Sequence, residues 1–209
     1  MKLLLLYLAV GLFSTANAQT DSVIILNKPS EVRGKNIMEA FASRASTREF
    51  SEEELSLQDI SDLLWAANGI NRSDEGKRTA PTAMNSQDID VYVVMRQGVY
   101  LYDAQKHKLI LITEGDYREA VAGRQKDFAK APLFCIMVSD ISRFKHGEES
   151  LKLTWAAMDA AYISQNIDLF CAGVGFKTRP RAGMDFDKLT DLLKLAPSQH
   201  LMLNNPVSK

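Results

Sequence analysis

Cysteine and histidine are scarce in this sequence, which limits the kinds of site it can build. The 209 residues include two cysteines and three histidines. His107, His146 and His200 are too scattered to give a metal-ligand spacing with one another or with the cysteines, so we expect no metal site. Cys135 and Cys171 each lie in an apolar run. We interpret both as small buried side chains, although an exported chain could pair them.

Excess charge, internal repeats and low-complexity segments are missing as well. The formal net charge is -1 at pH 7, which gives no electrostatic footprint for nucleic acid, so no nucleic-acid partner is expected. Hydrophobic residues make up 46% of the chain and charged residues 24%, a balance typical of globular proteins rather than disordered ones. The length fits one domain with a sizeable core.

The long hydrophobic run is at the N-terminus. Lys2 precedes an apolar run over residues 3–13, and Ala16, Asn17 and Ala18 match an A-x-A cleavage site. The run is too short to span a bilayer comfortably. Residues 1–18 are therefore predicted to be a secretory signal peptide, and the alternative is a buried N-terminal helix. The mature chain would start near Gln19, with no membrane span, and its expected location is the periplasm.

Hydrophobic periodicity predicts a mixture of helices and strands. Residues 19–35 are polar and are expected to form an N-terminal arm, followed by one domain over residues 36–209. Helices are predicted over 36–44, 57–67, 116–123, 151–172 and 185–195. Strands are predicted over 91–96, 133–139, 173–178 and 200–207, with a hairpin of 99–102 and 108–113 and an irregular stretch over 71–90. Because helices and strands do not alternate strictly, the predicted fold class is α+β.

The predicted helix over residues 151–172 is apolar nearly all round. Such a helix must be covered on several sides. Asp159 and Asp168 within it argue against a membrane span. Burial within one chain and against a second copy would cover it, which favours a homodimer with an apolar interface.

The stretch RASTREF, residues 44–50, has the side chains that suit a phosphate. Arg44 and Arg48 provide planar, multi-donor guanidinium groups, and Ser46 adds a hydroxyl. The alternative is a solvated helix end, which short mixed-charge runs usually mark.

Two further polar steps stand out. PTAMN, residues 81–85, lies just before a predicted buried strand, and its Asn85 could instead be an ordinary turn residue. PRAG, residues 180–183, lies between a predicted strand and a predicted helix, and Gly183 would let the backbone approach a partner closely. The alternative for PRAG is a plain strand–helix connection.

Together these stretches resemble the FMN-dependent nitroreductase-like family. The likeness is greatest to its branch of azoline- and thiazole-forming oxidases, the SagB/ThcOx type, which has a run similar to residues 68–94 and an ending similar to LMLNNPVSK. The resemblance covers roughly residue 36 to the C-terminus. It implies a nitroreductase-like FMN-binding fold, with a central mixed or antiparallel sheet flanked by helices, and a homodimer that holds FMN at its interface.

The resemblance also implies roles for individual residues. Arg44 would meet the phosphate of FMN, with Ser46 and Arg48 along the ribityl chain and toward the pyrimidine edge of the ring. Asn85 would face the polar edge of the ring, and the backbone N–H groups of Ala182 and Gly183 would bond N5 and O4. Nitroreductases often have glutamate where Ala182 stands. The full expected cofactor-binding set is Arg44, Ser46, Arg48, Pro81, Thr82, Asn85, Pro180, Arg181, Ala182, Gly183 and Lys209.

Two residue roles stay open at this point. Lys209 could replace the C-terminal cation that relatives place at the phosphate, or it could belong to a solvated tail. No residue matches a dedicated general base, so no catalytic residue is assigned.

The expected function is an FMN-dependent oxidoreductase that works by a ping-pong mechanism on small molecules. Its donor would be an exported or periplasmic compound, because nicotinamide cofactors are not expected outside the cytoplasm. One alternative is a non-enzymatic flavin-binding or flavin-storage protein that uses the same pocket. Another is a degenerate dimeric domain that binds a different small molecule.

Overall fold

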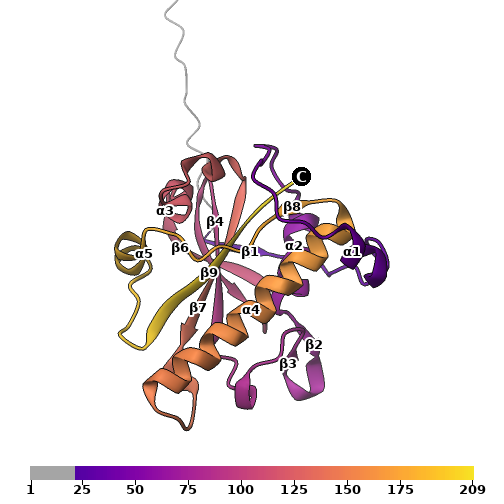
Figure 1. The fold of residues 1–209 in the computed structure, drawn as a ribbon. Coiled ribbons are helices and arrows are strands. Elements are labelled where there is room, and N and C mark those ends of the chain that lie inside the picture. Colours follow the sequence, from indigo (N-terminus) through magenta and orange to yellow (C-terminus); the bar gives the residue numbers. More distant parts are fainter. Residues whose placement is uncertain (1–21) are drawn as a thin grey trace, which may run out of the picture.

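Seven strands form the central sheet of this computed structural model, which describes residues 22–209 (Figure 1). The strand order is β1-β6-β5-β4-β7-β9-β8, and every neighbouring pair is antiparallel. The strands are β1 (Val23–Ile25), β4 (Ile89–Met95), β5 (Gly98–Asp103), β6 (Lys108–Glu114), β7 (Leu133–Asp140), β8 (Lys177–Thr178) and β9 (Gln199–Ser208). A separate hairpin consists of β2 (Ile70–Arg72) and β3 (Lys77–Arg78). The predicted signal peptide, residues 1–18, lies outside the described residues.

Helices cover both faces of the sheet (Figure 1). On one face lie α1 (Ile37–Ser43), α2 (Leu57–Asn68) and the long α4 (Glu149–Val174), and on the other lie α3 (Arg118–Ala122) and α5 (Phe186–Leu193). Strand β7 lies between β4 and β9, so it is buried on both sides. Because side chains alternate along a strand, Cys135 packs with the α2 and α4 side while Phe134 and Ile136 pack with the α3 and α5 side.

The two cysteines lie in the core, as interpreted from the sequence. Cys135 and Cys171 are both free and buried, and both belong to the cluster under α4. Burial raises the pKa of the Cys135 thiol to about 12, so the thiol form predominates at neutral pH.

Helix α4 is covered on one side and exposed on the other. Its Ala160, Ile163 and Ile167 are fully buried against the sheet. Met158 and Tyr162, in contrast, are about half exposed, at 52% and 48%. A single chain therefore leaves an apolar strip of this helix in solvent. Among the described helices, none is long and apolar enough to cross a membrane.

Most predicted elements are confirmed, and two predictions need correction. The predicted strand over 173–178 is wrong for most of its length, because α4 continues through Val174 and only Lys177–Thr178 is strand. The helix ends where Gly175 adopts a left-handed φ of 83°, a conformation that favours glycine. The arm is also more ordered than expected, since β1 pairs with β6.

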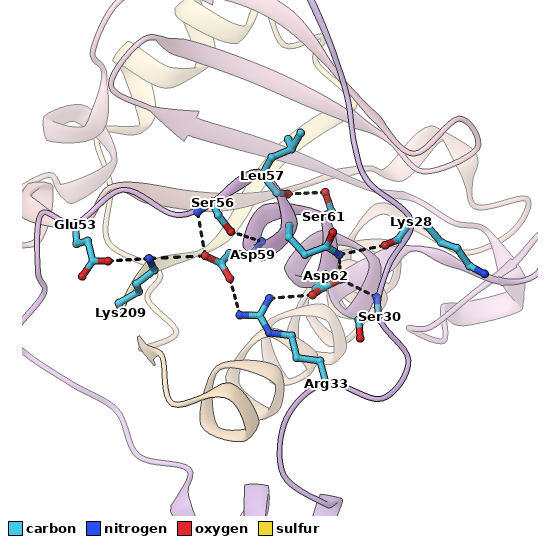
Figure 2. A network of polar contacts seen from close by, with 11 residues as sticks. Lys28, Ser30, Arg33, Glu53, Ser56, Leu57, Asp59, Ser61, Asp62 and Lys209 are labelled. Atoms are coloured by element: carbon cyan, nitrogen blue, oxygen red, sulfur yellow. Dashed lines mark hydrogen bonds and ion pairs between the residues drawn. The ribbon is translucent and has the colours of Figure 1, made fainter.

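The N-terminal arm is fastened to α2 by Arg33 (Figure 2). Its guanidinium group donates to Asp59 and Asp62, with Nη1 at 2.9 Å from Oδ2 of Asp62. Asp59 also completes a capping box with Ser56 at the start of α2. Burial acts to raise the pKa of Asp59, but hydrogen bonds from Arg33 and Ser56 outweigh it and leave that pKa below its ordinary value.

Removing this cation should destabilise the fold. We expect Arg33→Met to lower the free energy of unfolding by about 1–3 kcal/mol at pH 7, because two nearly buried carboxylates lose their partner. Because the folded pKa of Asp59 is lowered, the stabilisation is present above the unfolded value of about 3.9 and is lost as the pH falls through the folded value. Urea unfolding at neutral and acidic pH measures both effects.

Arg96→Met is the matched control, because Arg96 forms an exposed pair with Glu54 at 3.6 Å. Its loss should cost about 0.5 kcal/mol or less. Equal unfolding midpoints for the two variants at pH 7 would show that Arg33 does not fasten the arm.

Candidate functional site

The RASTREF stretch lies directly beside the strand that leads into PRAG. Ser46 forms a parallel bridge with Thr178, and the backbone N–H of Thr47 donates to the Thr178 carbonyl at 3.1 Å. The side chain of Arg179 returns a contact, from Nη1 to the Thr47 carbonyl at 3.4 Å. Two stretches that are more than 130 residues apart in the sequence therefore meet at the β8 edge of the sheet.

Arg44, Ser46 and Arg48 of RASTREF are exposed and make no side-chain hydrogen bond to a described residue. Arg44 ends α1, and its Nη1 lies 3.9 Å from Oδ2 of Asp168, but its guanidinium group makes no hydrogen bond to any described residue. Ser46 and Arg48 are exposed, and within residues 22–209 their side chains make neither hydrogen bonds nor ion pairs. Exposed donors without protein partners can meet a phosphate without first breaking a contact.

Asp168 explains how Arg44 is held. Asp168 is buried on α4 and accepts a hydrogen bond from Nδ2 of Asn205 at 3.1 Å. Burial raises the pKa of Asp168 to about 6, while Arg44 and Asn205 act in the opposite direction. At neutral pH the carboxylate is therefore mostly ionised and attracts the Arg44 guanidinium group.

In the described chain, no group of three His, Cys, Asp or Glu side chains could hold a metal ion.

The PRAG step presents two adjacent backbone donors to solvent. Arg181 pairs with Asn204 through two backbone hydrogen bonds, at 2.9 Å and 2.7 Å. Nδ2 of Asn204 also donates to the Gly183 carbonyl at 3.2 Å. Ala182 and Gly183 are exposed, and their N–H groups have no partner within residues 22–209. The carbonyl groups of Arg181 and Gly183 are thus bonded to Asn204, and the N–H groups of Ala182 and Gly183 are left for a ligand.

The Arg181 side chain points away from that ligand face. It is only 6% exposed. Its Nη1 and Nη2 donate to the carbonyls of Val121 and Ala122, at 3.2 Å and 2.7 Å, and its guanidinium carbon lies 5.0 Å from the centre of the Phe128 ring. These carbonyls end α3, where the last C=O groups of a helix need partners from outside it, and Ala122 also accepts from the Gln125 N–H at 3.1 Å. Both the backbone and the side-chain polar groups of Arg181, which the motif match placed in the cofactor set, are therefore already bonded within the chain.

The PTAMN step contacts α4 at a different position from RASTREF. The carboxylate of Asp159 accepts a hydrogen bond from the Ala83 N–H at 2.8 Å, whereas Arg44 lies beside Asp168. Nine residues of α4 separate these anchors, which at 1.5 Å per residue is roughly 13 Å. Pro81 and Asn85 are exposed, Thr82 is half-buried, and the Asn85 side chain makes no hydrogen bond to a described residue. One chain thus brings RASTREF and PRAG together but not PTAMN.

Lys209 makes contacts that neither sequence interpretation anticipated (Figure 2). Its Nζ lies 2.7 Å from Oε1 of Glu53 and 3.9 Å from Oδ2 of Asp59. The terminal cation therefore lies among carboxylates at the start of α2. Pro180, the remaining residue of the expected set, is exposed at the beginning of PRAG.

Sequence reasoning missed the residues that support the site from beneath. Asp159 and Asp168 were noted only as polar interruptions of an apolar helix, although a carboxyl group in such a helix needs a partner. Asn204 and Asn205 are fully buried in β9, where two consecutive asparagines are unusual for a strand. Both signals could have identified these residues as anchors.

Comparison with known proteins shows which family the chain belongs to. A profile of the nitroreductase family matches residues 41–207, which is most of the sequence. The chain belongs to the nitroreductase family and is a flavin-dependent oxidoreductase, and the predicted nitroreductase-like fold is confirmed.

Three relatives illustrate the range of similarity. A nitroreductase-like protein of Ralstonia eutropha JMP134, known as a crystal structure, is 32% identical, with 90% of each chain covered and a TM-score of 0.85. A nitroreductase-like protein of Methanocaldococcus jannaschii is 25% identical over 175 residues, or 79% of this chain and 87% of the relative. A chain of the Escherichia coli microcin synthetase McbBCD complex shares the fold at 15% identity, with 97% and 84% covered and a TM-score of 0.69.

Arg181 should matter for stability because its side chain is buried among carbonyl groups. We expect Arg181→Met to lower the free energy of unfolding by roughly 2–4 kcal/mol, since the end of α3 and the Asn204 side chain lose their donor. Chemical denaturation followed by circular dichroism measures this loss.

The exposed neighbour Arg124 makes no hydrogen bond or ion pair within the described residues, so Arg124→Met serves as the control and should stay within about 0.5 kcal/mol of wild type. If Arg181→Met unfolds like this control, the guanidinium group does not hold the PRAG step in place.

Proposed function

We propose that this chain binds FMN between two copies of itself and uses it to transfer electrons between small molecules. The observation that carries the proposal is the pair of unpartnered N–H groups at Ala182 and Gly183, next to the exposed side chains of Arg44, Ser46 and Arg48. The donor set suits the group: cationic donors for a phosphate at one end, and neutral backbone donors for the carbonyl and nitrogen edge of the ring at the other.

The chain's own residues divide the work. Arg44, Ser46 and Arg48 hold the phosphate and ribityl end, and Asp168 orients Arg44 from beneath. The N–H groups of Ala182 and Gly183 orient the ring through N5 and O4. Bound FMN would supply the hydride and electron chemistry itself, so the protein has to position it and adjust its electrostatic surroundings.

A second copy of the chain would complete the site. On α1, Ile37, Met38 and Phe41 are more than half exposed, and α1 is joined to α4 by a hydrogen bond from Oγ of Ser43 to the Ala172 carbonyl at 3.3 Å. Met158 and Tyr162 of α4 are exposed as well, and soluble monomers rarely leave large apolar patches open. A homodimer would bury these side chains. It would also bring PTAMN of one copy toward RASTREF and PRAG of the other, so that Asn85 faces the ring.

The reaction we propose is a ping-pong exchange at this single site. The donor and the acceptor would occupy the site one after the other, and bound FMN would supply the electron transfer to and from both. If the predicted signal peptide directs export to the periplasm, the donor is an exported or periplasmic compound rather than NAD(P)H. We also propose the azoline- and thiazole-forming branch, because residues 68–94 and the ending LMLNNPVSK resemble it.

The purified protein's absorbance spectrum tests this proposal. A flavoprotein should be yellow, with a band near ~450 nm, or should acquire this band on addition of FMN. A screen of donors and acceptors then separates an oxidoreductase from a flavin-storage protein, because storage predicts tight binding without turnover. A colourless protein that takes up no FMN would overturn the proposal.

Arg44 should account for a large part of the phosphate affinity. We expect Arg44→Ala to weaken FMN binding roughly 10- to 100-fold, because a charge-assisted contact contributes about 1.5–3 kcal/mol and each 1.4 kcal/mol is tenfold. Fluorescence titration measures the dissociation constant, with Arg96→Ala as a control for loss of an exposed arginine. An unchanged FMN affinity in Arg44→Ala would favour the alternative interpretation of RASTREF as a solvated helix end.

The backbone donor at residue 182 can be removed selectively. Ala182→Pro deletes the N–H and fixes φ, whereas Ala182→Ser keeps the donor. We expect the proline variant to lose flavin reduction by dithionite or a competent donor, or to lose the flavin, while the serine variant behaves like wild type. Flavin content is measured alongside. A proline variant that binds FMN and cycles normally would show that the Ala182 N–H does not contact N5.

A further inference from the structure

The turn that carries Asn85 is held in an unfavourable backbone conformation. Met84, Asn85 and Gln87 all have positive φ, at 55°, 51° and 47°. Asparagine tolerates this left-handed region, but methionine and glutamine rarely occupy it. Such a turn persists only where its surroundings hold it in place. The residues that hold it therefore also determine where Asn85 points.

Two buried carboxyl groups hold the turn at its two ends. At the start, Oδ2 of Asp159 accepts the Ala83 N–H at 2.8 Å. At the end, Oδ1 of Asp88 accepts from the Ser86 hydroxyl at 3.1 Å. Oδ2 of Asp88 accepts from the Ser139 hydroxyl in β7 at 2.5 Å. Asp159 is 2% exposed and Asp88 is fully buried, so neither carboxyl group is screened by bulk water.

The Asp88 carboxyl group is near enough to Asp159 to act on it, and two neighbouring buried carboxyl groups cannot both be charged without a large cost. Both oxygens of Asp88 accept hydroxyl hydrogen bonds, from Ser86 and Ser139. Burial and the neighbouring Asp88 carboxyl group together raise the pKa of Asp159 to about 7, although the Ala83 N–H acts to lower it. Asp159 therefore holds a proton below about pH 7.

The charged and titratable groups around the pair are engaged elsewhere. The Arg143 guanidinium forms an ion pair with Asp90 and donates to the Gln87 carbonyl at 2.9 Å. Nε of Arg78 donates to Oε1 of Gln87 at 3.0 Å. The other groups of this kind on the adjoining elements are Asp140, which follows Ser139 in β7, His200, which pairs with Ser139 from β9, and Tyr162 on α4. Neither arginine pairs with Asp159 directly, so neither neutralises it.

We propose that Asp159 is a positioning residue of the flavin site, and that its proton keeps the turn over residues 83–88 in the shape that aims Asn85 at the flavin. This inference rests on the proposed function. When Asp159 ionises, it keeps its bond to Ala83 but repels Asp88, so the two ends of the turn are forced apart. Asn85 lies between these ends and must move. Flavin affinity should then fall as the pH rises.

Protons can reach the pair from solvent. A cavity of about 230 Å³ beside the turn is lined by Thr82 and Ala83 on one side and by Trp155, Asp159 and Tyr162 of α4 on the other. The carboxyl group can therefore exchange its proton without unfolding of the helix.

Asp159→Asn keeps the hydrogen bonds that the protonated acid can make but cannot ionise. The asparagine oxygen can still accept from Ala83, and its NH₂ group can donate to Asp88, as the protonated acid does. FMN affinity is measured by fluorescence titration from pH 6 to pH 9 in wild type, Asp159→Asn and the exposed control Asp191→Asn. Ionisation of the FMN phosphate affects all three proteins equally. The ratio of each variant's dissociation constant to that of wild type therefore reports only the pH dependence that comes from the protein.

We expect wild type and Asp191→Asn to lose roughly fivefold in FMN affinity between about pH 7 and about pH 8. The reason is that only protein with a protonated Asp159 has the binding-competent turn, and this fraction falls as the pH rises. Asp159→Asn should lack this fall, and Asp159→Ala should bind weakly at every pH because Ala83 loses its acceptor. If Asp159→Asn follows the wild-type pH profile, or if Asp159→Ala binds like wild type, the inference is wrong.

The unfolding temperature of the flavin-free protein gives a readout that does not need the cofactor. Because the folded pKa of Asp159 is raised, the folded chain holds a proton that the unfolded chain releases above about pH 4, so wild-type stability should fall between about pH 4 and pH 7. Asp159→Asn should lack this part of the slope, and equal slopes would overturn the inference. If wild type binds no FMN, the proposed function fails and the inference with it. If FMN binds normally with parallel pH profiles, only the inference fails.

Discussion

The pairing of Arg181 with Asn204 is the interaction on which the ligand face of this protein depends. Two backbone hydrogen bonds fix PRAG against β9, and the buried guanidinium group joins it to the end of α3. These contacts use the carbonyl groups and the arginine side chain. What is left facing solvent is a pair of N–H groups, which is what a flavin edge requires. The site thus follows from how the chain satisfies its buried polar groups.

Helix α4 plays a similar role for the other parts of the site. It is mostly apolar, and its buried acids are placed where they meet loops from distant parts of the sequence. Asp168 lies under Arg44, and Asp159 holds the turn that carries Asn85. Because a helix is rigid, the spacing of these acids sets the spacing of the loops. The two acids are nine residues apart, or about two and a half turns, so they project from different sides of α4. In the proposed homodimer, the exposed residues of α4 would contact the second copy.

The sequence predicted the elements better than it predicted the contacts. Periodicity located the long helix and the central strands, because a buried face imposes a regular pattern on the residues that form it. It failed at residues 173–176, where helix and strand both fit an apolar run and the left-handed turn at Gly175 decides. It also missed β1, whose three residues are too few to give a pattern.

The candidate site was predicted in part. Motifs identified RASTREF, PTAMN and PRAG, but a motif does not specify the direction of a side chain. Arg181 turns inward because the end of α3, some 60 residues earlier, needs donors. Asp159 meets Ala83 across a separation of 76 residues. Lys209 meets Glu53 across a separation of 156 residues, because the last residue lies beside the start of α2. Contacts of this range depend on the whole fold, so no local pattern indicates them.

The central claim is that two copies of the chain share each flavin, with RASTREF and PRAG from one copy and PTAMN from the other. The direct measurement is the FMN stoichiometry of a mixed dimer, isolated with two affinity tags, in which one chain has Arg44→Ala and the other has Asn85→Ala. If the motifs come from different chains, one of its two sites is intact and the other is doubly altered. The account therefore predicts one tightly bound FMN per mixed dimer. A mixed dimer with no tight site would mean that all three motifs act within a single chain, which would contradict the account.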